Sequence, residues 1–132
     1  MSALVIDAGA LIALGRADRD MWVDLRRAET VGATVVVPTG VVAQAWRDGA
    51  RQVRLVRALQ SMDELPLDGV VARLAGALCA RSGSTDVIGA TVALVAASFP
   101  PSEPVTLATS DQSYLDGLLE LLRAGHVRIR PV

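Results

Sequence analysis

Apolar residues follow two patterns along the chain: short continuous runs, and longer segments with helical spacing. The short runs are mostly valine, leucine and alanine, as in strands that are buried on both faces of a sheet. Pro66 lies within the segment Asp63–Leu67, so that segment is either a strand at the edge of a sheet or a linker. We expect strands over Ala3–Ile6, Thr34–Val37, Asp63–Leu67, Val105–Thr109 and His126–Arg130.

The segments between these strands have helical spacing. Trp22 and Leu25 mark one such helix, Gly32 is placed to end it, and Thr39 is placed to cap the next. We expect helices after Asp7 and over Asp18–Val31, Thr39–Trp46, Arg51–Gln60, Asp68–Ala80, Ser84–Ser98 and Gln112–Ala124. Parallel crossovers are usually helical and right-handed. The alternation therefore predicts a three-layer α/β fold, with a mostly parallel sheet of four to five strands and helices on both faces.

Three aspartates stand where such a fold brings side chains together. Asp7 and Asp111 each follow a strand, and the carboxyl ends of parallel strands share the edge where ligands bind. Asp86 falls in the first turn of a helix that Ser84 or Thr85 caps. Converging carboxylates repel one another unless a cation offsets them, and oxygen ligands favour magnesium or manganese. The pattern predicts a divalent metal site; the alternative for Asp7 is that it only caps the following helix.

Length and composition indicate one domain over residues 1–132, since a chain of this size buries a real core. Apolar residues make up 52% of the chain, but no run reaches the roughly 18 residues of a membrane span. No basic segment precedes Arg16, so a secretory signal is not expected and we expect a cytoplasmic protein. The single cysteine, Cys79, excludes an internal disulfide and is expected in the core.

Charge and residue usage narrow the chemistry further. The net charge of −1 gives no overall signature of nucleic-acid binding, and all thirteen basic residues are arginine. A P-loop requires a lysine after its glycines, and receiver domains and aspartyl-nucleophile phosphatases use one beside their acidic cluster. The absence of lysine excludes these classes.

Four short motifs occur in a characteristic order and spacing: VIDAGALIAL, VVVPTGVVAQAWR, STDVIGATVALVA and VTLATSDQSYL. In these motifs the chain resembles, over nearly its whole length, the PIN domain ribonucleases, which include the VapC-type toxins of bacterial toxin–antitoxin pairs. The resemblance implies a PIN-like fold and hydrolysis of RNA phosphodiester bonds with Mg²⁺ or Mn²⁺. It also implies that Asp7, Asp86 and Asp111 are the metal-binding and catalytic residues, and Thr109 matches a position that is often hydroxylated.

Gln44 departs from this pattern, because many PIN domains carry a glutamate on the helix after the second strand. A glutamine offers a carbonyl oxygen to a metal but no negative charge, so we expect weaker metal affinity. Asp48 lies one helical turn beyond Gln44, and Asp116 lies on the helix after the last acidic motif. These two residues, with Thr109 and Ser110, are the candidates for an auxiliary role.

Arginines near Gln44 are the candidates for contact with RNA or with an antitoxin. Arg47, Arg51 and Arg54 share one helix face if the helix continues past Gly49, and Arg57 extends the set. RNA phosphates require such a cationic surface. A solvated helix face is the alternative. In the toxins that the chain resembles, a partner segment covers the active site.

Two functions remain open from the sequence. One is a metal-dependent ribonuclease that acts as the toxin of a toxin–antitoxin pair. The other is a PIN-fold module that has lost catalysis through Gln44 and binds RNA or a partner protein. The apolar stripe around Trp22 and Leu25 belongs either to the core or to a homodimer face.

Overall fold

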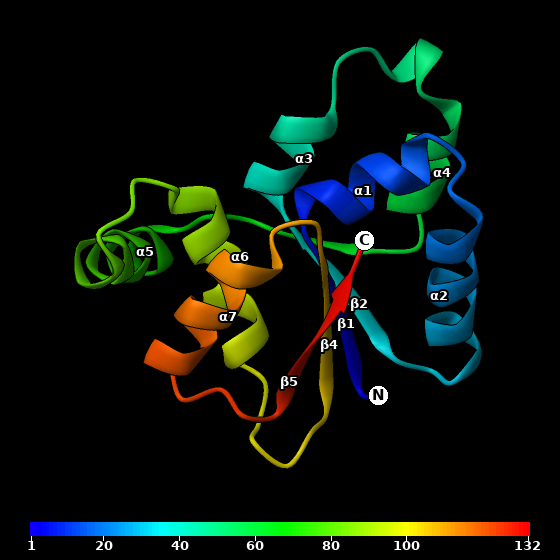
Figure 1. Cartoon of the computed structure of the whole chain (residues 1–132). Coiled ribbons are helices and arrows are strands. Elements are labelled where there is room, and N and C mark those ends of the chain that lie inside the picture. The colour runs from blue at the N-terminus through cyan, green and yellow to red at the C-terminus, as the bar shows by residue number, and fades with distance from the viewer.

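The computed structural model describes all 132 residues as a central sheet between two layers of helices (Figure 1). The strands are β1 (Ala3–Ile6), β2 (Thr34–Pro38), β3 (Asp63–Leu65), β4 (Val105–Thr109) and β5 (Val127–Pro131). All neighbouring pairs are parallel, and the strand order is β3-β2-β1-β4-β5. The expected PIN-like α/β fold is confirmed. The sheet is entirely rather than mostly parallel, and β3, just before Pro66, is an edge strand.

Helices connect every strand to the next. They are α1 (Ala8–Gly15), α2 (Arg19–Thr30), α3 (Thr39–Ala45), the 3-10 helix η1 (Gly49–Arg51), α4 (Val53–Leu59), α5 (Gly69–Ser82), α6 (Val87–Ala97) and α7 (Gln112–Leu121). The chain steps outward from β1 to β3 and then crosses to β4 and β5. Right-handed crossovers therefore put α1 to α4 on one face and α5 to α7 on the other, as Figure 1 shows. None of these helices combines the length and the apolar character that a membrane crossing requires.

Small aliphatic side chains build the core on both faces of the central strands. Every residue of β1 is buried, because β2 and β4 flank it: Val5 pairs with Val36 on one side and Leu107 on the other. Helix α6 is buried from Gly89 to Ala93 and packs against β1 and β2. Cys79 is buried in the same core, as expected.

The apolar stripe of α2 also packs inward. Leu25 is fully buried, and Trp22 is half-buried with its indole N–H donating to the carbonyl oxygen of Leu14 at 2.9 Å. The helical spacing of Trp22 and Leu25 is therefore explained by packing within the chain.

Two helix starts and one helix end differ from the expected ones. Thr39 is the first residue of α3 rather than its cap; Pro38 takes the cap position and forms no side-chain bond. The same helix ends at Ala45, because Trp46 has an extended backbone with φ −74° and ψ 132°. Asp86 is itself the N-cap of α6 instead of a first-turn residue behind Ser84 or Thr85.

Later boundaries shift by a few residues. Helix α5 continues through Ser82, and Gly83 ends it in the left-handed conformation with φ 70°. Helix α7 ends at Leu121 rather than at residue 124, since Arg123 has a positive φ of 53° that no α-helix contains. These shifts leave the order of elements unchanged.

Candidate functional site

The acidic residues lie at the carboxyl ends of β1 and β4. These neighbouring strands form the point where the strand order reverses, and the helices that follow them leave toward opposite faces. Such a reversal opens a crevice at the sheet edge, and α/β proteins bind ligands there. Asp7 directly follows β1, Asp111 lies two residues after β4, and Asp86 begins α6, which contacts β1.

Asp7 is the most enclosed of the three acids, with 8% of its surface exposed. One carboxylate oxygen accepts the N–H of Ala8 at 2.7 Å, so Asp7 does cap α1. The other oxygen accepts the hydroxyl of Thr109 at 2.6 Å. Neither donor is charged, and none of the ion pairs in the structure involves Asp7. Because buried charges are normally paired or coordinate a metal, Asp7 is a buried carboxylate that lacks a counter-charge within the chain.

Thr109 connects Asp7 to Asp111. Its side chain is fully buried at the end of β4, and its hydroxyl oxygen accepts the backbone N–H of Asp111 at 3.0 Å while donating to Asp7. Asp111 is exposed and forms no side-chain cap on α7. One hydroxyl therefore fixes the two acidic positions relative to each other and leaves the carboxylate of Asp111 free of the helix that it precedes.

Asp86 is attached to α7 through its backbone. Its side chain accepts the N–H of Gly89 at 2.9 Å, and its own N–H donates to the hydroxyl of Ser84 at 3.0 Å. The hydroxyl of Tyr114, in the first turn of α7, donates to the carbonyl oxygen of Asp86 at 3.2 Å. The first turns of α6 and α7 are thus held together beside the sheet edge.

Two glycines allow this close approach of helix starts. A Cβ added at Gly9 would stand 2.2 Å from the hydroxyl oxygen of Ser110, and one added at Gly89 would stand 2.7 Å from the ring of Tyr114. Any larger residue would force the first turn of α1 away from the loop after β4, or α6 away from α7. Neither glycine has a positive φ, so close packing rather than backbone conformation requires them.

The donors at this edge are carboxylate, hydroxyl and backbone groups. Such an all-oxygen set fits a hard divalent cation such as magnesium or manganese. With the side chains placed as they are, no group of three or more His, Cys, Asp or Glu residues can hold a metal ion jointly. The carboxylate of Asp86 accepts the N–H of Gly89 in its own helix cap.

Gln44 lies on α3 and is exposed. It lines a groove of about 290 Å³ between α1, α3 and η1, next to Ile12 and three arginines, Arg16, Arg47 and Arg51. No carboxylate lines this groove. The structure thus places the glutamine among positive charges on the side of α1 that is nearer its C-terminus.

The condition for a shared arginine face, a helix that continues past Gly49, is not met. Because α3 ends at Ala45, Arg47 lies in the following loop, Arg51 in η1 and Arg54 in α4. Only Arg47 and Arg51 of these line the groove beside Gln44.

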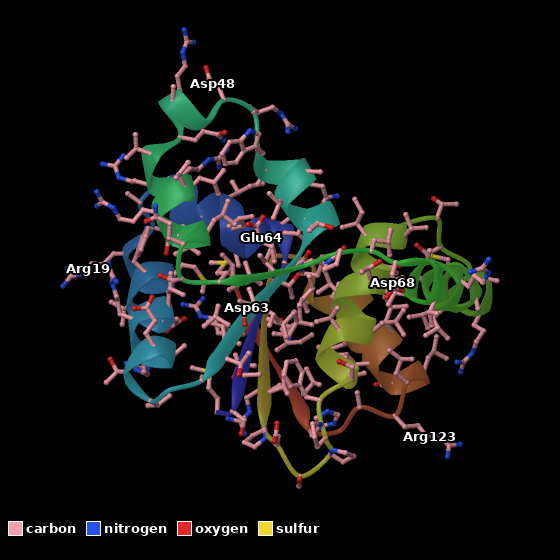
Figure 2. All side chains as sticks on the ribbon, turned by 180° about the vertical axis from the view of Figure 1, so that it is seen from behind. Arg19, Asp48, Asp63, Glu64, Asp68 and Arg123 are labelled. Atoms are coloured by element: carbon pink, nitrogen blue, oxygen red, sulfur yellow. The ribbon has the colours of Figure 1, made fainter.

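The remaining candidates lie farther out. Asp48, at the outer tip of the segment between α3 and α4 (Figure 2), caps η1 at Ala50 and is 3.7 Å from Arg51. Asp116 is exposed in the middle of α7, where it borders a groove with Arg123.

Sequence reasoning missed two features of the site. The sequence gives Tyr114 only a place in a motif, yet its hydroxyl bridges α7 to Asp86. Gly9 and Gly89 also received no role. A glycine two or three residues after an acid at a helix start is the signal that could have indicated them.

The fold has parallels among solved structures, although no family model and no curated protein matches the sequence. One similar chain comes from a crystal structure of VapBC2 from Rickettsia felis bound to a DNA fragment of its promoter. It is 12% identical to this chain over 98% of both chains, with a TM-score of 0.62. A chain of VapBC-5 from Mycobacterium tuberculosis, a member of the VapBC family of toxin–antitoxin systems, is 24% identical over 100% of both chains with a TM-score of 0.53. At these identities the likeness establishes a shared fold.

Proposed function

We propose that the chain is a Mg²⁺- or Mn²⁺-dependent ribonuclease that hydrolyses RNA phosphodiester bonds. The observation that supports this most is the buried carboxylate of Asp7, which has no cationic partner and lies at the strand reversal. A bound cation would supply the missing counter-charge. Asp111, whose position Thr109 fixes relative to Asp7, would be the second ligand.

Asp86 would be the third ligand, after a rotation of its carboxylate away from the N–H of Gly89 or through a bridging water. When bound, a magnesium ion at such a site activates a water for in-line attack on a phosphodiester and stabilises charge on the leaving oxygen. Asp7 and Asp111 would hold and orient the cation, and Thr109 would keep the carboxylate of Asp7 in place. Gln44 would contribute at most a neutral oxygen to the site.

We further propose that the chain is the toxin of a toxin–antitoxin pair, with an antitoxin protein as its partner. Two solved structures with a similar fold are named as VapBC, and one of them as a member of the VapBC family of toxin–antitoxin systems. Arg47 and Arg51 are exposed beside Gln44, where they would contact RNA phosphates or an acidic segment of the antitoxin.

The test is cleavage of a mixed cellular RNA pool by the purified chain with magnesium, with manganese and with a chelator. We expect discrete cuts that require metal and that disappear in Asp7→Asn and Asp111→Asn. Asp63→Asn, which removes an exposed carboxylate on β3, is the control that should cut normally.

Metal binding without any cutting would contradict the nuclease. That result would favour the second candidate, a PIN-fold module that binds RNA or a protein. The replacement of the usual acid by Gln44 supports this candidate, and restoring the acid would be its first test.

A further inference from the structure

A second cavity lies two strands away from Asp7, between α3, α4 and the edge strand β3. Its volume is about 480 Å³, within the range of roughly 300–1,000 Å³ that ligand pockets span. Six residues line it: Val42, Trp46, Val56, Leu59, Gln60 and Glu64. The candidate nuclease site uses none of them.

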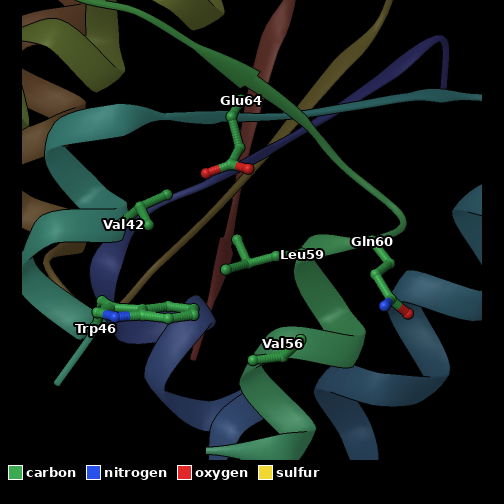
Figure 3. Close-up of a pocket in the computed structure, with 6 residues that line it drawn as sticks. All are labelled: Val42, Trp46, Val56, Leu59, Gln60 and Glu64. Atoms are coloured by element: carbon green, nitrogen blue, oxygen red, sulfur yellow. The ribbon is translucent and has the colours of Figure 1, made fainter. Parts of the chain in front are cut away.

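Glu64 is the only charged residue of this cavity, and no ion pair in the structure involves it. Figure 3 shows its carboxylate pointing from β3 into the cavity, between Val42 and Leu59, with the indole of Trp46 lying flat across the other side. Asp63 and Glu64 leave β3 on opposite sides, as expected of consecutive strand residues (Figure 2). The cavity therefore combines an aromatic face, an aliphatic wall and one unpaired negative charge.

The position of Trp46 is fixed by its surroundings. A Cβ at Gly49 would stand 2.7 Å from Cζ2 of the indole, so only glycine lets η1 pack against the ring. The side chain of Gln52 holds the same segment: its Oε1 accepts the N–H groups of Arg47 and Asp48 at 2.7 and 2.9 Å, and its Nε2 donates to Ala45 at 3.0 Å. Trp46 nevertheless remains 40% exposed, so its ring is held in place and open to a ligand.

We propose that this cavity binds one arginine side chain of a partner polypeptide. A guanidinium is planar, stacks on aromatic faces and pairs with a carboxylate through two hydrogen bonds, so it matches Trp46 and Glu64 together. The methylene stem of the arginine would lie against Val42 and Leu59. The charge complementarity of a lone carboxylate in an apolar wall selects a cationic group over an acidic or purely apolar one.

A polypeptide fits better than a free cation because the apolar surface continues outside the cavity. Val53, one turn before Val56 on α4, is 60% exposed and has no partner within the chain to cover it. It can pack against an apolar residue beside the bound arginine. Binding of an arginine here requires neither metal binding nor RNA cleavage. A negative result at this cavity would therefore leave the proposed nuclease activity untouched.

The test is an NMR titration of the ¹⁵N-labelled full chain, in chelator and without RNA, with the peptide acetyl-Leu-Arg-Leu-amide. We expect shifts of the Trp46 indole N–H and of the amides of Val56 and Glu64. The same peptide with citrulline, which is neutral and nearly isosteric with arginine, should bind about tenfold more weakly because it lacks the charge-assisted pair. Acetyl-arginine-amide should also bind more weakly than the peptide, since it leaves Val53 uncovered.

Variants assign the binding to the cavity. Glu64→Gln should weaken the arginine peptide to the level of the citrulline peptide, and Trp46→Leu should weaken it without removing the preference for arginine. Asp63→Asn, the neighbouring charge on the other side of β3, should leave both affinities unchanged. Equal binding of the two peptides, or an unchanged affinity in Glu64→Gln, would overturn the proposal. A monomer–dimer equilibrium that Glu64→Gln shifts would also overturn it, because the occupant would then be a second copy of the chain.

Discussion

Two halves of the same sheet edge are held by different kinds of side chain. On the β1–β4 half, a fully buried hydroxyl, Thr109, joins two of three acids that have no cationic partner. On the β2–β3 half, a half-buried amide, Gln52, organises a loop whose neighbouring groove is lined by arginines. The first arrangement is continuous with the core, while the second lies in a peripheral segment between short helices.

This difference indicates how each half responds to perturbation. Removing a hydrogen bond between two core strands should destabilise the whole domain, since a buried polar group then loses its partner. Breaking a bond in a peripheral loop should open that loop locally at a smaller free-energy cost. Substitutions in the two halves should therefore differ in how much they lower the free energy of unfolding and in how far their effects spread.

The largest effect is expected for Thr109→Val. Valine has nearly the same shape, but it removes the hydroxyl partner of one carboxylate oxygen of Asp7 and of the N–H of Asp111. We expect a loss of about 2–4 kcal/mol in the free energy of unfolding, from two hydrogen bonds of which one is to a charged group. Urea denaturation measures it, and Thr106→Val on the same strand is the control. A loss no larger than that of the control would show that the hydroxyl does not tie the site to the core.

Gly9→Ala is expected to have the next largest effect. The added Cβ would stand 2.2 Å from the hydroxyl oxygen and 3.0 Å from the backbone N of Ser110, so α1 and the loop after β4 must separate. We expect a loss of about 1–3 kcal/mol, as for overpacked cores.

Gly76→Ala is the matched control for that variant, because a Cβ at Gly76 meets nothing within 4 Å. It lies within α5 and should gain up to about 1 kcal/mol from helix propensity. If both glycine variants gave the same change by thermal or urea unfolding, the close contact with Ser110 would not be a constraint.

Gln52→Ala should have a smaller, local effect. Three hydrogen bonds are lost, but water can replace them in this partly exposed segment, so we expect a loss of only about 1 kcal/mol in global stability. Hydrogen exchange should nevertheless become faster at Arg47 and Asp48 while that of the β1 amides stays unchanged. Faster exchange throughout the sheet would mean that the two halves are not independent.

The smallest expected effect concerns affinity rather than stability. Gln44→Glu should tighten manganese binding by about threefold to tenfold if residue 44 faces the cation, since an added carboxylate attracts it. Gln60→Glu adds the same charge at the C-cap of α4 and should change nothing. An unchanged titration curve for Gln44→Glu would remove this position from the ligand set and leave it to the arginine-lined groove.

Local patterns in the sequence were sufficient for the fold. The buried runs, Pro66 and the helical spacing placed all five strands and their order of appearance, because each rests on short-range rules of burial and turn chemistry. The expected end of α3 at Trp46 lies one residue beyond the observed end at Ala45, whose carbonyl oxygen accepts the side-chain amide of Gln52, seven residues away.

For the site, the sequence predicted which residues follow the strands but not how they are held. Asp7 and Asp111 were placed at one edge from topology alone. The hydroxyl bridge of Thr109, the contact of Gly9 with Ser110 and the bond from Tyr114 to Asp86 each join elements far apart in the chain. Such contacts arise from tertiary packing, which no local pattern encodes.

The most direct test of the central hypothesis is where a paramagnetic cation binds. Substoichiometric Mn²⁺, added to the ¹⁵N-labelled chain in the absence of RNA, broadens the amide signals of residues close to the bound ion. The proposed site predicts broadening centred on Asp7, Asp86 and Asp111, absent in Asp7→Asn, with the amides of Glu64 and Arg47 unaffected. Broadening centred on another carboxylate group, or an unchanged pattern in Asp7→Asn, would contradict the assignment of the three aspartates as one metal site.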